Sequence, residues 1–157
     1  MTGPGFENLD RYLAEFQKIV LTTHESPDPD GIGAETAFAE YLSAIGKTVL
    51  ICNADETPVK YRFLDKDSAI TIIKEDSPLP DDIKDWGFVV LDTNDVENTG
   101  TAYRRVAPLV SDFFIIDHHS RQAAGEERHF IDGTASSTSE MVYYIFERAG
   151  IKPSLQA

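Results

Sequence analysis

Residues 18–46 read KIVLTTHESPDPDGIGAETAFAEYLSAIG and contain the pattern on which the fold prediction rests. Residues 18–23 are mostly apolar or β-branched, which predicts a short buried strand. Two prolines and a glycine make the following segment, HESPDPDG, a loop. Residues 32–45 are rich in alanine and carry an apolar face, which predicts a helix that Gly46 ends. The stretch is therefore a strand, a loop and a helix, with His24 directly after the strand.

The same alternation of short apolar runs with helical patterns continues along the chain. Further strands are predicted at residues 47–52, 87–91 and 113–116, and further helices at residues 6–17, at 103–109 and from Ser137, where STSE matches a capping box. Residues 53–85 are expected to hold a helical turn, a strand within SAITIIKE and a proline-rich connection. Short apolar strands that alternate with helices predict an α/β fold, with a mostly parallel sheet and helices on both of its faces.

The composition indicates a soluble protein without disulfides. With 157 residues, 41% hydrophobic and 26% charged, the chain is expected to form one soluble domain. No apolar stretch approaches the roughly 20 residues of a membrane span and no signal peptide is recognisable, so we expect a cytoplasmic protein with no membrane partner. Cys52, the single cysteine, follows an apolar run and is expected to be a buried hydrophobe, which argues against disulfides and against a thiolate nucleophile.

The net charge of −13 argues against a nucleic-acid surface of the electrostatic kind, since Lys and Arg are scattered along the chain. The acidic charge does not exclude nucleotide substrates. Divalent cations bound by carboxylates neutralise the charge of those carboxylates, and the bound cations attract phosphate.

The loop after the first strand carries a candidate metal site. His24, Asp28 and Asp30 place one imidazole and two carboxylates within THESPDPDG. Oxygen ligands with an imidazole suit Mn²⁺ or Mg²⁺, whereas structural zinc sites more often include cysteines. The alternative is that Asp-Pro-Asp-Gly only forms a turn and that His24 only ends a strand.

Two other strands also end in polar residues. Asp92 follows the strand at 87–91, and Asp117, His118 and His119 follow the strand at 113–116. Parallel sheets bind ligands at the carboxyl ends of their strands, so these residues are expected to meet. One histidine of the pair can bind a metal while the other faces a substrate, and an acid can fix an imidazole by a hydrogen bond. Capping by Asp92 and a structural role for one of the histidines are the alternatives.

The order H-x-x-x-D-x-D, then a strand-end Asp, then D-H-H resembles the first three motifs of the DHH phosphoesterase family. That family includes RecJ-type exonucleases, nanoRNases that also hydrolyse 3′-phosphoadenosine 5′-phosphate, cyclic-dinucleotide phosphodiesterases and, as relatives, family II pyrophosphatases. The resemblance runs from about Lys18 to Glu140. The segment ASSTSE, residues 135–140, also resembles the serine- and threonine-rich helix start of the nanoRNase branch.

The resemblance implies a role for each matching residue. His24 and Asp28 would bind one divalent ion, Asp30 and His118 a second ion, and Asp92 both ions. Two metals about 3.5–4 Å apart stabilise the attacking and leaving oxygens of an in-line displacement. The catalytic residues would be His119, in contact with the scissile phosphate, and Asp117, which orients its neighbours. Ser136 and Ser137 are expected to cap a helix rather than to touch substrate, and His129 to be an ordinary surface or packing residue.

The chain departs from the family pattern after its D-H-H motif. Family members carry a fourth metal-binding aspartate in a segment like G-I-x-x-D-T-G, followed by a C-terminal substrate-binding domain. Neither follows Asp117 before the chain stops at KPSLQA. We therefore expect residues 1–157 to be an incomplete N-terminal DHH domain that is poorly active alone. Apolar surface left uncovered at the incomplete edge would favour a homo-oligomer.

The sequence thus predicts a phosphoesterase that depends on two divalent ions, Mn²⁺ first and Mg²⁺ second. Its expected substrates are phosphodiester or phosphomonoester bonds of short oligonucleotides or small nucleotides. Inorganic pyrophosphatase is the enzymatic alternative. The alternatives from another class are a non-catalytic regulatory domain that binds metal or nucleotide, and an acidic α/β binding module without metal.

Overall fold

The computed structural model describes residues 4–65, 68–119 and 126–154. Within them, six strands form one sheet in the order β3-β2-β1-β4-β5-β6, and all neighbouring strands are parallel. The strands are β1 (Lys18–Thr22), β2 (Thr48–Asn53), β3 (Ile70–Ile72), β4 (Gly87–Leu91), β5 (Phe113–Asp117) and β6 (His129–Ile131). The predicted parallel sheet is confirmed.

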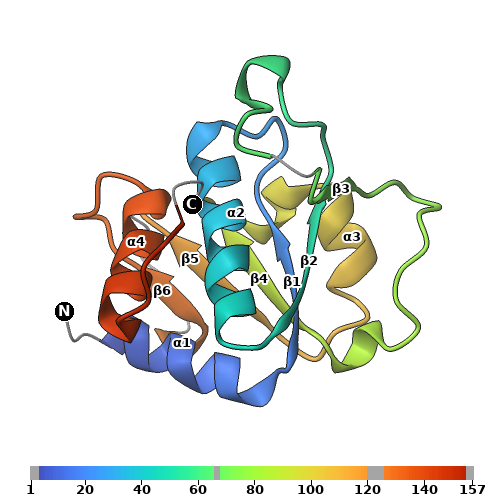
Figure 1. Ribbon diagram of the computed structural model, residues 1–157. Coiled ribbons are helices and arrows are strands. Elements are labelled where there is room, and N and C mark those ends of the chain that lie inside the picture. Colours follow the sequence, from blue (N-terminus) through green and yellow to red (C-terminus); the bar gives the residue numbers. More distant parts are fainter. Residues whose placement is uncertain (1–3, 66–67, 120–125, 155–157) are drawn as a thin grey trace.

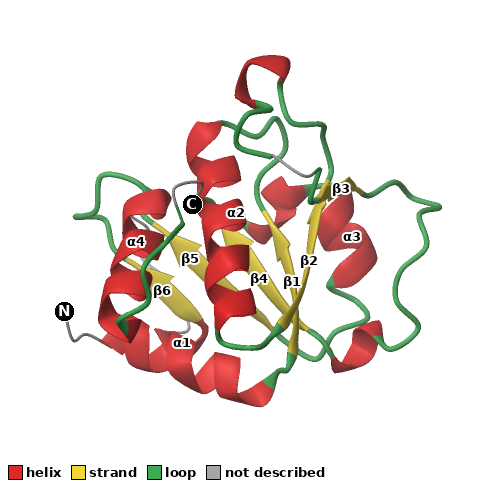
Figure 2. Cartoon of the chain, in the orientation of Figure 1, coloured by secondary structure: helices red, strands yellow, loops and turns green. Residues whose placement is uncertain are grey.

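Helices cover both faces of the sheet, as predicted (Figures 1 and 2). The helices are α1 (Pro4–Glu15), α2 (Pro29–Ala44), α3 (Thr101–Val106) and α4 (Thr138–Ala149), with single 3₁₀ turns η1 (Val59–Tyr61), η2 (Ile83–Asp85), η3 (Val96–Thr99) and η4 (Glu126–Arg128). Side chains alternate along a strand, so Val89 and Leu91 of β4 pack with α1, α2 and α4, whereas Phe88 and Val90 pack with α3. None of the described helices is long and apolar enough to cross a bilayer.

The strand order reverses between β1 and β4. The chain runs from β1 outward to β2 and β3, and then returns to place β4 on the other side of β1. In sheets of this order, ligands bind in the crevice outside the carboxyl ends of the strands at the reversal. Thr22 pairs with Val90, so His24 and Asp92 each lie two residues beyond a matched pair. The register therefore delivers these two side chains to the same crevice.

The bounds of several predicted elements differ from those in the structure; the helix expected at residues 6–17, for example, spans Pro4–Glu15. The helix expected at residues 32–45 begins at Pro29, because Asp28 caps it by accepting hydrogen bonds from the backbone N–H groups of Asp30 (2.9 Å) and Gly31 (3.1 Å). Asp30 therefore lies in the first helical turn rather than in a loop. The strand at 47–52 is shifted by one residue, and the helix expected at 103–109 spans Thr101–Val106.

Other sequence expectations have clear outcomes. The strand within SAITIIKE and the helical turn before it are present as β3 and η1. The short strand β6 was not predicted, since three residues are too few to show a period. Cys52 is buried as expected, and burial raises the pKa of its thiol to about 12, so the thiol stays protonated near neutral pH.

Candidate metal centre

The residues singled out in the sequence gather at the carboxyl edge of the sheet. His24 follows β1, Asp92 follows β4 and His118 follows β5, while Asp28 and Asp30 come from the start of α2. Asp28 and Asp92 lie within 4.0 Å of His24, and Asp30 and Asp92 within 3.7 Å of His118. Strand ends and a helix start that are far apart in the sequence thus form one cluster.

Asp92 lies at the middle of the cluster. Its Oδ2 atom is 3.7 Å from Nε2 of His24, and its Oδ1 atom is 3.7 Å from Nε2 of His118. The backbone of Asp92 has a φ of +63°, in the left-handed region, which Asp tolerates better than most residues. Backbone strain of this kind is often found at functional sites. The carboxylate is almost fully buried and directs one oxygen to each histidine.

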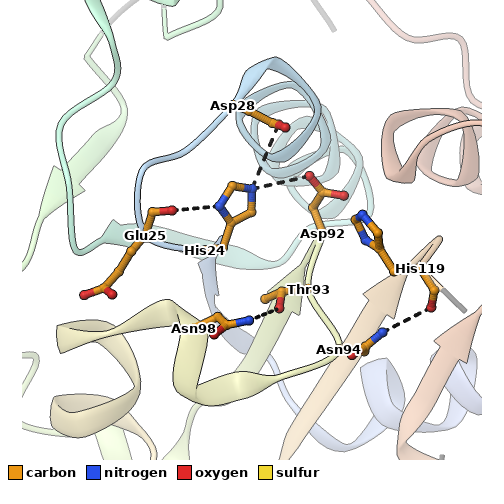
Figure 3. Close-up of a pocket in the computed structure, with 8 residues that line it drawn as sticks. All are labelled: His24, Glu25, Asp28, Asp92, Thr93, Asn94, Asn98 and His119. Atoms are coloured by element: carbon orange, nitrogen blue, oxygen red, sulfur yellow. Dashed lines mark hydrogen bonds and ion pairs between the residues drawn. The ribbon is translucent and has the colours of Figure 1, made fainter. Parts of the chain in front are cut away.

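His24, Asp28 and Asp92 form the first group that could hold a cation (Figure 3). Nε2 of His24 lies 4.0 Å from Oδ1 of Asp28 and 3.7 Å from Oδ2 of Asp92. An ion fits between such donors, since Mg²⁺ binds oxygen at about 2.0–2.1 Å. Nδ1 of His24 lies 2.8 Å from the carbonyl oxygen of Glu25, which favours a proton on Nδ1 and leaves Nε2 for a metal. The contact with the Asp92 carboxylate raises the pKa of His24 to about 9, so protons compete with metal at neutral pH.

Asp92, His118 and His119 form a second group. Asp30 also lies near it, with Oδ2 3.7 Å from Nε2 of His118. The geometry therefore offers two candidates for the third ligand of a second ion, namely Asp30, which the family resemblance implies, and His119. The assignment of Asp30 as ligand and His119 as catalytic residue stays a prediction.

Asp117 holds His119 in place. The Oδ1 atom of Asp117 lies 2.8 Å from Nδ1 of His119, and the Asp117 side chain is fully buried. This hydrogen bond raises the pKa of the His119 imidazole. His119 also lines an open pocket. The contact is the one expected of an orienting acid, and the catalytic roles of both residues remain predictions.

The start of α4 contacts two of the predicted ligands. Backbone N–H groups of Thr138 and Ser139 each donate a 2.8 Å hydrogen bond to the Asp30 carboxylate, and the Thr138 hydroxyl donates one of 2.9 Å to Oδ1 of Asp92. Burial would raise the pKa of Asp30, but the hydrogen bonds from Ser139 and Thr138 outweigh burial and lower it. The helix N-terminus thus keeps Asp30 ionised.

Thr138 and Ser139 were missed in the sequence. Ser137 caps α4 as expected, by accepting a 3.0 Å hydrogen bond from the backbone N–H of Glu140. The carboxylate of Glu140 returns to Ser136 rather than to Ser137, so the predicted capping box is displaced by one residue. The segment ASSTSE was the available signal, but the contact with Asp30 spans more than 100 residues.

The three residues of the first group line a pocket of about 630 Å³ (Figure 3). Its walls combine the predicted metal ligands and His119 with neutral polar side chains. The lining residues are His24, Glu25, Asp28, Asp92, Thr93, Asn94, Asn98 and His119. Asn94 donates a hydrogen bond to the carbonyl oxygen of His119 (3.1 Å), and Asn98 one to the hydroxyl of Thr93 (3.3 Å). The segment after β4 therefore forms one wall and contacts the backbone of the D-H-H segment.

Comparison with known proteins gives the family and the fold. A family model described as the DHH family, N-terminal domain, matches residues 18–156. The chain belongs to the DHH family. Uncharacterized proteins of Mycoplasma genitalium and Mycoplasma pneumoniae are 25% and 26% identical to this DHH domain, over 93% and 91% of it. The structure of an exopolyphosphatase-related protein from Bacteroides fragilis covers 93% of the DHH domain with a TM-score of 0.79 and 23% identity, which shows a shared fold.

The DHH domain spans less than half the length of these relatives. It covers 43% and 42% of the two Mycoplasma proteins and 44% of the Bacteroides fragilis chain.

The contact between α4 and Asp92 gives a test of the centre. In Thr138→Val, the hydroxyl that donates to Asp92 is lost while the size of the side chain is kept. We expect Mn²⁺ affinity in titration calorimetry to fall by about 10- to 100-fold, as is usual when a ligand loses its hydrogen-bond partner. Thr36→Val is the matched control, because the Thr36 hydroxyl donates only to backbone within α2. Equal affinities for the two variants would contradict a role for Thr138.

Proposed function

We propose that this DHH domain is the metal-binding part of a phosphoesterase that cleaves phosphodiester or phosphomonoester bonds in short oligonucleotides or small nucleotides. The observation that carries the proposal is the position of Asp92, whose two oxygens each lie 3.7 Å from a different histidine. A carboxylate placed in this way suits a pair of adjacent cations. Carboxylate oxygens and imidazoles are ligands that Mn²⁺ accepts readily, with Mg²⁺ as the alternative.

Each residue of the centre has a task in this proposal. His24, Asp28, Asp30, Asp92 and His118 would hold the metal ions. When bound, the ions would activate water and neutralise charge on the phosphate, as two-metal sites do. His119, kept in orientation by Asp117, would donate a hydrogen bond to a phosphate oxygen. Its raised pKa supports this role, because a protonated imidazole donates from both nitrogens.

The pocket supports a nucleotide rather than pyrophosphate as substrate. None of the eight described residues that line it is Lys or Arg. A small, highly charged anion such as pyrophosphate gains most from cationic side chains. Thr93, Asn94 and Asn98 instead offer neutral hydrogen-bonding groups beside the predicted ligands, which suit the hydroxyl groups of a ribose.

The experiment is a substrate comparison with the natural full-length protein. Mn²⁺-dependent release of phosphate or mononucleotides would be measured with a short oligonucleotide, 3′-phosphoadenosine 5′-phosphate and pyrophosphate. We expect turnover of at least one of the two nucleotide substrates and little turnover of pyrophosphate. Preferential cleavage of pyrophosphate would favour the alternative enzyme, and Mn²⁺ binding without turnover of any substrate would favour a regulatory domain.

His119 offers a sharper test within the same assay. His119→Ala should lower turnover by about 100-fold or more, the usual range for loss of a hydrogen-bond donor that faces developing negative charge. Its metal content should stay near that of the wild type, because the predicted ligands are all retained. Metal content would be measured by elemental analysis after gel filtration.

The comparison variant is His118→Ala, which should lose metal and activity together. Equal loss of metal in the two variants would make His119 a ligand, in agreement with the group formed by Asp92, His118 and His119.

A further inference from the structure

Glu35 is a buried carboxyl group without a role in the proposed chemistry. It lies on α2 with no exposed surface. Its Oε1 atom accepts a 2.7 Å hydrogen bond from the side-chain amide of Asn53, while Oε2 has no hydrogen-bond partner among the residues that the structure describes. Buried carboxyl groups are rarely left in this state without a reason.

Asn53 connects α2 to the end of β1 by hydrogen bonds. Its side-chain oxygen accepts hydrogen bonds from the backbone N–H of Thr23 (3.3 Å) and from the hydroxyl of Thr22 (3.4 Å). The backbone pairing of β1 with β2 ends at Leu21 and Ile51. Beyond it, the Asn53 side chain provides the acceptor for the backbone N–H of Thr23 that the next residue pair of the sheet would otherwise provide. Its amide can do this only if its N–H₂ group faces Glu35.

Thr23 continues the network to β4. Its hydroxyl donates a 3.0 Å hydrogen bond to the carbonyl oxygen of Leu91. Thr23 directly precedes His24, and Leu91 directly precedes Asp92. A Cβ atom at Gly31, in the first turn of α2, would lie only 2.3 Å from the Thr23 hydroxyl, so the helix packs tightly on this point. The network therefore joins α2, β2, β1 and β4 next to the first group, which contains His24 and Asp92.

We propose that Glu35 and Asn53 are positioning residues that set the orientation of His24 and Asp92 for metal binding. Asn53 holds the backbone before His24, and Glu35 fixes which way the Asn53 amide faces. The proposal rests on the proposed metal centre, but it concerns the affinity for metal and not the reaction.

The protonation state of Glu35 fits this role. Burial raises its pKa to about 8, so the carboxyl group is mainly neutral near neutral pH. The titratable groups that act on it are Asp65, which raises the pKa, and His24, which lowers it, and Glu35 in turn affects the thiol of Cys52. A neutral carboxyl keeps the acceptor for Asn53 without adding charge behind the metal centre. Glutamine has the same shape and offers the same acceptor.

The test compares Glu35→Leu with Glu35→Gln in Mn²⁺ titrations of the natural protein. In Glu35→Leu, the acceptor for Asn53 is lost, and affinity at the site that contains His24 should fall by about tenfold or more. Affinity at the site that contains His118 should fall less, because Asp92 is the one predicted ligand of that site that the network reaches, through the carbonyl oxygen of Leu91. In Glu35→Gln, both affinities should stay at the wild-type values. His24→Ala identifies which of the two transitions belongs to the His24 site.

Tyr12→Phe controls for a general loss of stability. The Tyr12 hydroxyl bonds to the backbone of Phe88, at the opposite end of β4 from the metal centre. This variant should melt at a lower temperature yet bind Mn²⁺ normally. If Glu35→Leu does not fold, Asn53→Ala removes the same link and should weaken the same site.

Unchanged Mn²⁺ binding in the folded variant, or equal weakening at both sites, would overturn the proposal. The titration needs no turnover, so a wild-type protein that binds Mn²⁺ but cleaves no phosphate ester would refute the proposed function alone.

Discussion

Asp92→Asn is expected to abolish binding of both metal ions. Each oxygen of the Asp92 carboxylate lies 3.7 Å from a different histidine, so one substitution removes a charged ligand from both groups. Asparagine keeps the size of the side chain and tolerates the left-handed backbone at this position, which alanine would occupy only with strain. Loss of a hydrogen bond to a metal ligand lowers metal affinity by about 10- to 100-fold. We expect Asp92→Asn to lower the affinity of each site by more than this, because the ligand itself is changed.

Titration calorimetry with Mn²⁺ measures this effect, and circular dichroism checks that the variant is folded. His24→Ala is the comparison, because His24 belongs to the first group alone. That variant should lose one transition and keep the other. If Asp92→Asn loses only one site, Asp92 does not bridge two ions, and the phosphoesterase proposal loses its main support.

Glu35→Gln should remove a strong pH dependence from the stability of the metal-free protein. The pKa of Glu35 rises from its ordinary value of 4.5 to about 8 on folding, because burial disfavours the charged form. Between these values the folded protein holds a proton that the unfolded chain releases. The stability from Glu35 is therefore complete below pH 4.5 and is lost as pH rises through about 8.

The loss is about 1.4 kcal/mol per pH unit and about 5 kcal/mol over the whole interval. Such a difference is comparable to the total stability of many domains. Urea unfolding of the metal-free wild type and of Glu35→Gln at several pH values between 4.5 and 8 measures it. Glutamine cannot ionise, so the stability of the variant should fall less steeply with pH. The two curves should diverge as pH rises, with Glu35→Gln the more stable.

Glu56→Gln is the matched control, since it changes the same chemical group on an exposed side chain. Its unfolding curves should follow those of the wild type. Parallel pH profiles for the wild type and Glu35→Gln would mean that Glu35 is ionised in the folded protein. Asn53 would then face a buried anion rather than a neutral acid.

The principal strands could be predicted from the sequence because each is a short apolar run with clear ends. Residues 87–91 are predicted and observed with the same bounds. Local pattern is less informative where few residues form an element, as in β6, or where a cap lies outside the apolar pattern. Asp28 extends α2 to Pro29 through hydrogen bonds that a hydrophobic pattern does not reveal.

The sequence by itself determined the chemical types at the centre and their places after strands, since His24, Asp92 and the D-H-H segment each follow an apolar run. The tertiary structure decided which of these side chains meet. It placed β4 beside β1, turned the two oxygens of Asp92 to different histidines, and brought Thr138 and Ser139 to the carboxylate groups. It also placed Glu35 beneath the centre. The physical reason is that strand order and helix packing depend on contacts between distant segments, whereas periodicity and capping depend on neighbours along the chain.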